Sequence, residues 1–143
     1  MCGIAGFTTF NQAQATESQL MKMGDVIQHR GPDGSAYYND KHALLVHTRL
    51  SIIDIEGGEQ PIHNEDKNIW VSFNGEIYNY KELKKELDYN WETESDTEVL
   101  LASYIKWGKD CLNKLNGMFS FAIWDSKENK LFAARDRFGV KPF

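Results

Sequence analysis

The stretch Met1-Cys2-Gly3-Ile4-Ala5-Gly6-Phe7 opens the chain, and the rest of the sequence is best interpreted outward from it. Its apolar run predicts a strand, in which Gly3 and Gly6 allow another backbone or a ligand to approach closely. If Met1 is removed, Cys2 carries both a thiol and a free α-amine, and an α-amine titrates near pH ~8. Such an amine can take the proton of the thiol, which makes Cys2 a candidate nucleophile. On position alone, a small apolar side chain near a strand start is the simpler explanation.

Composition limits the classes of protein to which the chain can belong. Its 143 residues, 41% of them hydrophobic and 13% aromatic, suit one folded domain. The net charge of -5 comes without a basic cluster, so nucleic acid is not an expected partner. No apolar run approaches ~20 residues and no secretory signal opens the chain, so we expect no membrane span and a cytoplasmic location. The 2 cysteines do not suggest a disulfide framework, and the 4 histidines lack metal-ligand spacing, so no metal site is expected.

The pattern of apolar residues predicts strands, then helices, then strands. Residues 43–50 begin with a continuous apolar run, which is typical of a strand covered on both faces. Ser95 and Glu98 have the spacing of a capping box, with Ser95 as N-cap and Glu98 reaching back to it. Helices are expected over 16–29, 81–87, 95–107 and 110–115, and strands over 2–9, 35–38, 43–50, 69–73, 118–124 and 130–134. This order favours an α+β fold over alternating βαβ units.

Asn74-Gly75 is the strongest short turn signal in the chain, and it has two interpretations. As a hairpin turn it would end the strand that begins at Ile69. As a catalytic element it would form an oxyanion hole, with an Asn side-chain amide and a backbone N–H aimed at one point. The residues alone favour the turn.

Charged residues supply the other candidates for a binding site. Arg49 stands at the end of an expected strand, where it could hold a carboxylate through two hydrogen bonds or form an ordinary surface ion pair. Glu76 and Asp96 could bind an ammonium group, although carboxylates are usually solvated and Asp96 also suits the first turn of a helix. The stretch 30–34, Arg-Gly-Pro-Asp-Gly, is explained by a helix stop. Each signal is weak by itself.

Taken together, these stretches resemble the glutaminase domain of glutamine-dependent asparagine synthetases, which are class II glutamine amidotransferases. The resemblance spans nearly the whole chain, in order. It rests on Met1 to Gly6, Arg30 to Gly34, Arg49 to Asp54, Gln60-Pro61, Phe73 to Asn79, Ser95 to Glu98, Gly117 to Ala122 and Arg135 to Gly139. It implies that residues 1–143 form a glutamine amidotransferase type 2 domain. The implied fold is a four-layer αββα sandwich of the N-terminal-nucleophile hydrolase type.

The resemblance also implies roles for individual residues. Cys2, freed of Met1, would attack the side-chain amide of glutamine, with its own α-amine as general base. Asn74 and Gly75 would stabilise the oxyanion that forms. The implied residues of the glutamine-binding site are Arg49 for the α-carboxylate, Glu76 and Asp96 for the α-ammonium, Asn74 and Gly75 at the amide, and the backbone of Leu50, Ser51, Ile52 and Ile53 along the pocket.

Two departures from the family pattern limit what the resemblance implies. The family continues into further strands and a C-terminal synthetase domain that uses ATP and magnesium, so we expect this domain to be incomplete at its C-terminal end. If Met1 is retained, the proposed base is an amide and not an amine. Other acceptors, such as a sugar, a peptide or an antibiotic precursor, and a non-catalytic module remain alternatives to asparagine synthesis. Dimers are common in the family, so a homodimer also remains open.

Overall fold

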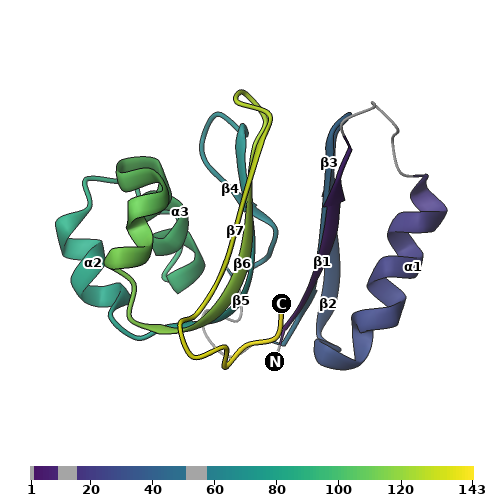
Figure 1. The fold of residues 1–143 in the computed structure, drawn as a ribbon, viewed down its shortest axis with the longest axis horizontal. Helices are drawn as coiled ribbons and strands as arrows, with labels where there is room; N and C mark the ends of the chain where they lie inside the picture. The colour runs from purple at the N-terminus through teal and green to yellow at the C-terminus, as the bar shows by residue number, and fades with distance from the viewer. Residues whose placement is uncertain (1, 10–15, 51–57) are drawn as a thin grey trace.

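Two antiparallel sheets lie face to face in the computed structural model, with helices covering both outer faces (Figure 1). The structure describes residues 2–9, 16–50 and 58–143. The layers run α1, the first sheet, the second sheet, and then α2 with α3. This is the αββα arrangement that the resemblance implied, and the α+β class is confirmed.

The first sheet has three strands in the order β1-β3-β2. They are β1 (Gly3–Thr8), β2 (Gly34–Asn39) and β3 (Ala43–Arg49). The central strand β3 is buried almost throughout, as its apolar run predicted. Its Leu44 and Val46 pack with Leu20 of α1 (Glu17–Ile27), whereas Leu45 faces the second sheet and packs with Trp124. A 3₁₀ turn, η1 (Gln28–Arg30), follows α1.

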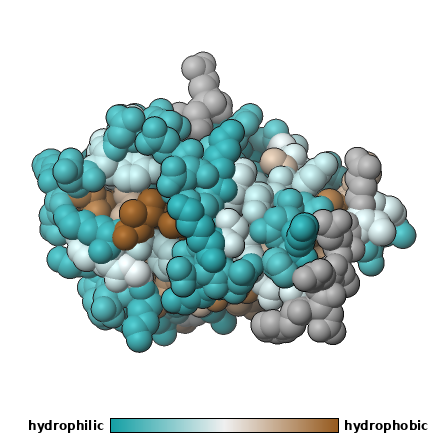
Figure 2. All heavy atoms as spheres, turned by 90° about the horizontal axis from the view of Figure 1, so that it is seen from above, coloured by the Kyte–Doolittle hydropathy of each residue, from teal (hydrophilic) through white to brown (hydrophobic). Residues whose placement is uncertain are grey.

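The second sheet has four strands in the order β4-β5-β6-β7. They are β4 (Ile62–His63), β5 (Ile69–Ile77), β6 (Gly117–Asp125) and β7 (Lys130–Arg135). Phe73, Phe121 and Ile123 point toward the helices α2 (Tyr80–Glu86) and α3 (Asp96–Trp107) and form the main core with them. A second 3₁₀ segment, η2 (Gly108–Asn113), follows α3 where an ordinary helical stretch was expected. The outer surface is mostly hydrophilic in the view of Figure 2.

The interpretation of Asn74-Gly75 as a hairpin turn was wrong. Strand β5 runs through both residues to Ile77, and Gly75 pairs with Phe119 of β6. A Cβ on Gly75 would lie 2.3 Å from the carbonyl oxygen of Met118, far inside van der Waals contact. Glycine is therefore required here by the close approach of β6, and this tertiary requirement overrides the turn preference of the dipeptide.

The predicted capping box of α3 is only half correct. Ser95 is the N-cap, and its side chain accepts a hydrogen bond from the Thr97 N–H. The carboxylate of Glu98 does not return to Ser95. It accepts from the N–H groups of Glu92 and Thr93 at 2.9 and 2.8 Å. Glu98 thus holds the backbone of residues 92 and 93, which precede the helix, whereas Ser95 caps the first turn of the helix.

Candidate functional site

One small cavity brings together the described residues that the sequence singled out. It lies between the ends of the two sheets and has a volume of about 90 Å³. Cys2 precedes β1, Arg49 ends β3, Gly75 lies in β5 and Asp96 begins α3, so segments far apart in the sequence supply its wall. The predicted residues that line it are Cys2, Arg49, Leu50, Asn74, Gly75, Glu76 and Asp96. Met1, Ser51, Ile52 and Ile53 lie outside the described residues.

Cys2 is half-buried at the mouth of this cavity. Its Sγ lies 3.4 Å from the Leu50 nitrogen, whose N–H donates to the sulfur, and 3.7 Å from the Leu50 carbonyl oxygen. The Arg30 Nε–H donates to the Cys2 carbonyl oxygen at 3.1 Å. These contacts with the surrounding backbone fix the position of Cys2 in the cavity wall.

The hydrogen-bond pattern of β5 shows where the Gly75 N–H points. Alternate residues of a strand direct their N–H groups to opposite edges. On the edge away from β6, the Phe73 N–H donates to Gln60 Oε1 at 2.7 Å and the Ile77 N–H to Asp96 Oδ2 at 2.9 Å. Gly75 lies between these two on the same edge, and Gly75 lines the cavity. Its N–H is therefore placed as a donor toward a ligand in the cavity.

Asp96 is the most buried acid of the cavity wall, with 5% of its surface exposed. Burial, together with the negative charge of Glu76, raises the pKa of Asp96 to about 6, although hydrogen bonds from backbone N–H groups oppose the shift. Two acids close together in a buried site favour a cation between them, because it relieves both burial and repulsion. The wall around Asp96 is thus suited to an ammonium group.

Arg49, at the end of β3, supplies positive charge to the cavity wall. Its carbonyl oxygen accepts from the Asp33 N–H at 3.0 Å, and its backbone bridges to Pro32, so the loop after η1 holds it in place. The stretch 30–34 is therefore more than a helix stop. It carries Arg30 to Cys2 and fixes the backbone of Arg49.

Three further residues were missed as site residues from the sequence. Arg30 binds the backbone of Cys2, and Gln60 joins β5 to α3 by accepting from Phe73 and donating to Thr97 Oγ1 at 3.2 Å. Lys141, from the segment after β7, lines the same cavity. Arg30 and Gln60 lie in stretches that carried the resemblance, and that was the only signal pointing to them.

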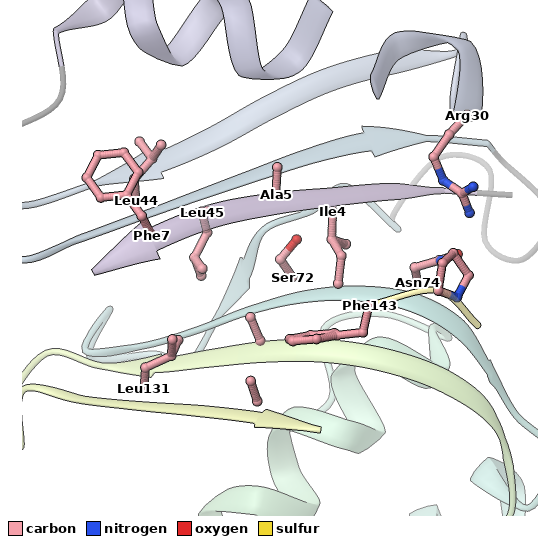
Figure 3. A pocket seen from close by; sticks show the side chains of 14 residues that line it. Ile4, Ala5, Phe7, Arg30, Leu44, Leu45, Ser72, Asn74, Leu131 and Phe143 are labelled. Atoms are coloured by element: carbon pink, nitrogen blue, oxygen red, sulfur yellow. The ribbon is translucent and has the colours of Figure 1, made fainter. Parts of the chain in front are cut away.

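A larger cavity of about 430 Å³ separates the sheets beside the first one. Its walls are mainly apolar and include Ile4, Phe7 and Leu45, whereas Arg30 and Asn74 lie together at one end (Figure 3). Asn74 lines both cavities, so its side chain lies at the wall that they share.

The comparison with protein families decides what kind of domain this is. Residues 1–143 match the sequence profile described as "Glutamine amidotransferase domain". The chain belongs to this family. The amidotransferase domain is 50% identical, over its whole length, to asparagine synthetase [glutamine-hydrolyzing] 3 of Bacillus subtilis (strain 168), of which it covers 24%. It is 43% identical over its whole length to a putative asparagine synthetase [glutamine-hydrolyzing] 2 of Methanocaldococcus jannaschii, of which it covers 31%.

A comparison with solved structures identifies the fold of the amidotransferase domain. It superposes with a TM-score of 0.70 on glutamine phosphoribosylpyrophosphate amidotransferase from B. subtilis, over 99% of this chain and 38% of that one. At 21% identity this likeness concerns the fold, which is the N-terminal-nucleophile hydrolase sandwich. Within the part of the chain that the structure describes, no helix is long and apolar enough to cross a membrane.

Proposed function

We propose that this amidotransferase domain hydrolyses the side-chain amide of glutamine to glutamate and ammonia through a thioester on Cys2. The observation that carries the proposal is the single cavity that joins the Cys2 thiol, the Gly75 edge of β5 and the charges of Arg49 and Asp96. Family membership supports glutamine as the substrate. The names of the relatives support a hydrolytic reaction.

The reaction begins when the thiolate of Cys2 attacks the carbonyl carbon of the glutamine amide. The carbonyl oxygen becomes an oxyanion, which the Gly75 N–H and the Asn74 side-chain amide stabilise. After removal of Met1, the α-amine of Cys2 takes the thiol proton and delivers it to the departing ammonia. Water then attacks the thioester, releases glutamate and returns the thiol.

Substrate binding uses the two charged ends of the amino acid. Arg49 pairs with the α-carboxylate, because its planar guanidinium can donate two hydrogen bonds to it. Glu76 and Asp96 pair with the α-ammonium, and this cation offsets the cost of keeping Asp96 ionised in a buried position. Leu50, Ser51, Ile52 and Ile53 complete the pocket with backbone groups in this proposal.

Release of ammonia and glutamate from glutamine by the full-length protein tests the proposal. Cys2→Ala should reduce both to background, while folding stays intact because the side chain is small and half-buried. Unchanged ammonia release in Cys2→Ala would exclude the thioester mechanism. Mass spectrometry of the N-terminus should find that active protein begins at Cys2, and activity with Met1 retained would exclude the α-amine as the base.

The use of the ammonia is a second part of the proposal. The chain spans only 24% and 31% of the lengths of the two relatives described above. We propose that a C-terminal synthetase domain uses ATP, magnesium and this ammonia to convert aspartate to asparagine in the cytoplasm. Asparagine formation by the full-length protein supplied with glutamine, aspartate and ATP tests this. Glutamine hydrolysis without asparagine would indicate another acceptor, and gel filtration tests a homodimer.

A further inference from the structure

The segment after β7 is folded around the carboxylate of Asp136. Its Oδ1 accepts from the N–H groups of Phe138 and Val140 at 3.1 and 2.9 Å, and its Oδ2 from those of Lys141 and Phe119 at 3.1 and 3.2 Å. Burial disfavours the charged carboxylate, but these four hydrogen bonds outweigh it and hold the pKa of Asp136 at about 2. The segment is therefore an ordered loop, and Asp136 joins it to Phe119 of β6, the residue that pairs with Gly75.

The backbone of Lys141 is held from both sides in this loop. Asp136 accepts from its N–H, and the guanidinium of Arg135 donates to its carbonyl oxygen and to that of Gly139. Because both polar groups of the peptide are engaged, the position from which the Lys141 side chain leaves the backbone is fixed. The side chain then lines the same cavity as Cys2, Gly75 and Asp96.

The loop directs its charge inward and its apolar side chains outward. Lys141 is only 4% exposed, whereas Phe138 and Val140 are 94% and 58% exposed. Burying an ammonium is costly unless other groups compensate for it, so a lysine is a poor choice for filling space. The reversal of the usual pattern brings a basic side chain to the cavity wall.

The charges of the cavity wall suggest why. Without Lys141, the described wall would carry two acids, Glu76 and Asp96, and one base, Arg49. Glutamine has one positive and one negative end and adds no net charge. Lys141 adds a second base to this described wall. A nearby cation favours the ionised form of a carboxylate, and an ionised carboxylate is what binds an ammonium.

We propose that Lys141 is a positioning residue of the glutamine site, and that Asp136 holds it there. Its ammonium favours the ionised form of the Asp96 carboxylate in the same cavity, and so selects a ligand that carries an α-ammonium. This inference rests on the proposed glutaminase function. It concerns how the substrate is selected and oriented, and the bond-breaking steps stay with Cys2, Asn74 and Gly75.

Glutamine kinetics of the full-length protein carrying Lys141→Met test this inference. Methionine keeps the length of the side chain and removes its charge. We expect KM for glutamine to rise about tenfold or more with kcat little changed, because a binding contribution is lost. Lys141→Arg should restore most of the affinity. Lys127→Met, which removes an exposed lysine, is the matched control and should leave KM unchanged.

Two further readouts separate positioning from a merely structural role. The acid limb of the kcat/KM profile reports Asp96, and it should move to higher pH in Lys141→Met. The titratable and charged groups that line the same cavity as Asp96 are Glu76 from β5, Arg49 from β3, Cys2 before β1 and Lys141. Discrimination between glutamine and its analogue lacking the α-amine should also fall. Asp136→Asn should raise KM as well, but with a lower melting temperature, because it loosens the loop.

The outcomes distinguish the two proposals. If the wild-type protein releases no ammonia from glutamine, or if Cys2→Ala retains activity, the proposed function fails. If the wild-type protein is an active glutaminase but Lys141→Met leaves KM, the pH profile and the discrimination unchanged, the function stands and the role of Lys141 is overturned.

Discussion

The two halves of this domain differ in how thoroughly they are packed. The half made of β4–β7, α2 and α3 contains the larger described core, with fully buried residues such as Phe73, Phe121 and Leu100. The half made of β1–β3 and α1 buries a smaller described cluster around Leu20, Leu44 and Val46. Each sheet is thus well supported on its helical side, and the large half more so.

The seam between the halves is packed quite differently. A cavity of about 430 Å³ lies within it, and polar contacts bridge it at separate points. His47 Nε2 lies 3.2 Å from the Phe73 carbonyl oxygen, and the Trp124 Nε1–H donates to Asp40 at 2.7 Å. Cys2 and Arg49 come from the small half, and Gly75 and Asp96 from the large half. The comparison teaches that the site is assembled across the boundary between the halves, where the larger cavity also lies.

The sharpest test of this comparison lies where β5 meets β6. In Gly75→Ala the new Cβ would lie 2.3 Å from the Met118 carbonyl oxygen, so the strands must separate and the 75 N–H must move. We expect kcat for glutamine hydrolysis to fall by roughly 10²–10³, as for loss of one oxyanion donor. Gly34→Ala is the control, because its Cβ would meet nothing within 4 Å. Wild-type kcat in Gly75→Ala would argue against the Gly75 N–H as a donor.

One buried group from each half, His47 and Asp96, should change the free energy of unfolding in opposite directions as the pH falls. Burial lowers the pKa of His47 from 6.5 to about 4. A hydrogen bond with the Phe73 backbone opposes this shift, and the positive charge of Arg49 adds to it. The unfolded chain then binds this proton more readily, so stability falls as the pH drops from about 6.5 to 4. Burial raises the pKa of Asp96 from 3.8 to about 6, so its contribution rises as the pH falls from about 6 to 4.

These opposing contributions, each about 3 kcal/mol, should nearly cancel in the wild-type protein. Asp96→Asn should reveal the loss due to His47, and His47→Gln should reveal the gain due to Asp96. Urea denaturation between pH 4 and 7 provides the measurement. A pH-independent free energy of unfolding in Asp96→Asn would contradict the assignment to His47.

The smallest expected effect lies at the far end of the seam, around Asp40. Its Oδ2 accepts from the Tyr38 hydroxyl and from the indole N–H of the buried Trp124, both at 2.7 Å. Asp40→Asn should cost about 1–3 kcal/mol in the free energy of unfolding, since it threatens to leave a buried donor unsatisfied. Asp66→Asn, at an exposed ion pair, should change stability by less than about 0.5 kcal/mol.

Activity measurements on the same variants show whether the two ends of the seam are coupled. If kcat of Asp40→Asn stays at the wild-type value while stability falls, the ends act independently. A drop in kcat as large as that of Gly75→Ala would mean that the seam behaves as one unit.

The sequence predicted best those helices and strands whose position depends on the local spacing of apolar residues. The helix expected over 16–29 and the buried strand β3 follow from spacing alone, and both are confirmed. Asn74-Gly75 was misinterpreted because the approach of β6 is a tertiary fact that no local pattern records. Lys141 was missed for a similar reason, since its burial depends on the hydrogen bonds of Asp136. The gathering of Cys2, Arg49 and Asp96 came from the resemblance and not from the residues taken singly.

The edge of β5 has one more consequence, for association between molecules. An unpaired strand edge invites another chain to add to the sheet. Here β4 covers the start of the edge, while Gln60 and Asp96 occupy the N–H groups on either side of Gly75. Within the described residues, Gly75 lies alone between those two on this edge, and one N–H is too short a run for a strand to pair with. The same side chains that frame the proposed oxyanion donor therefore also protect this edge of β5 from pairing with another chain.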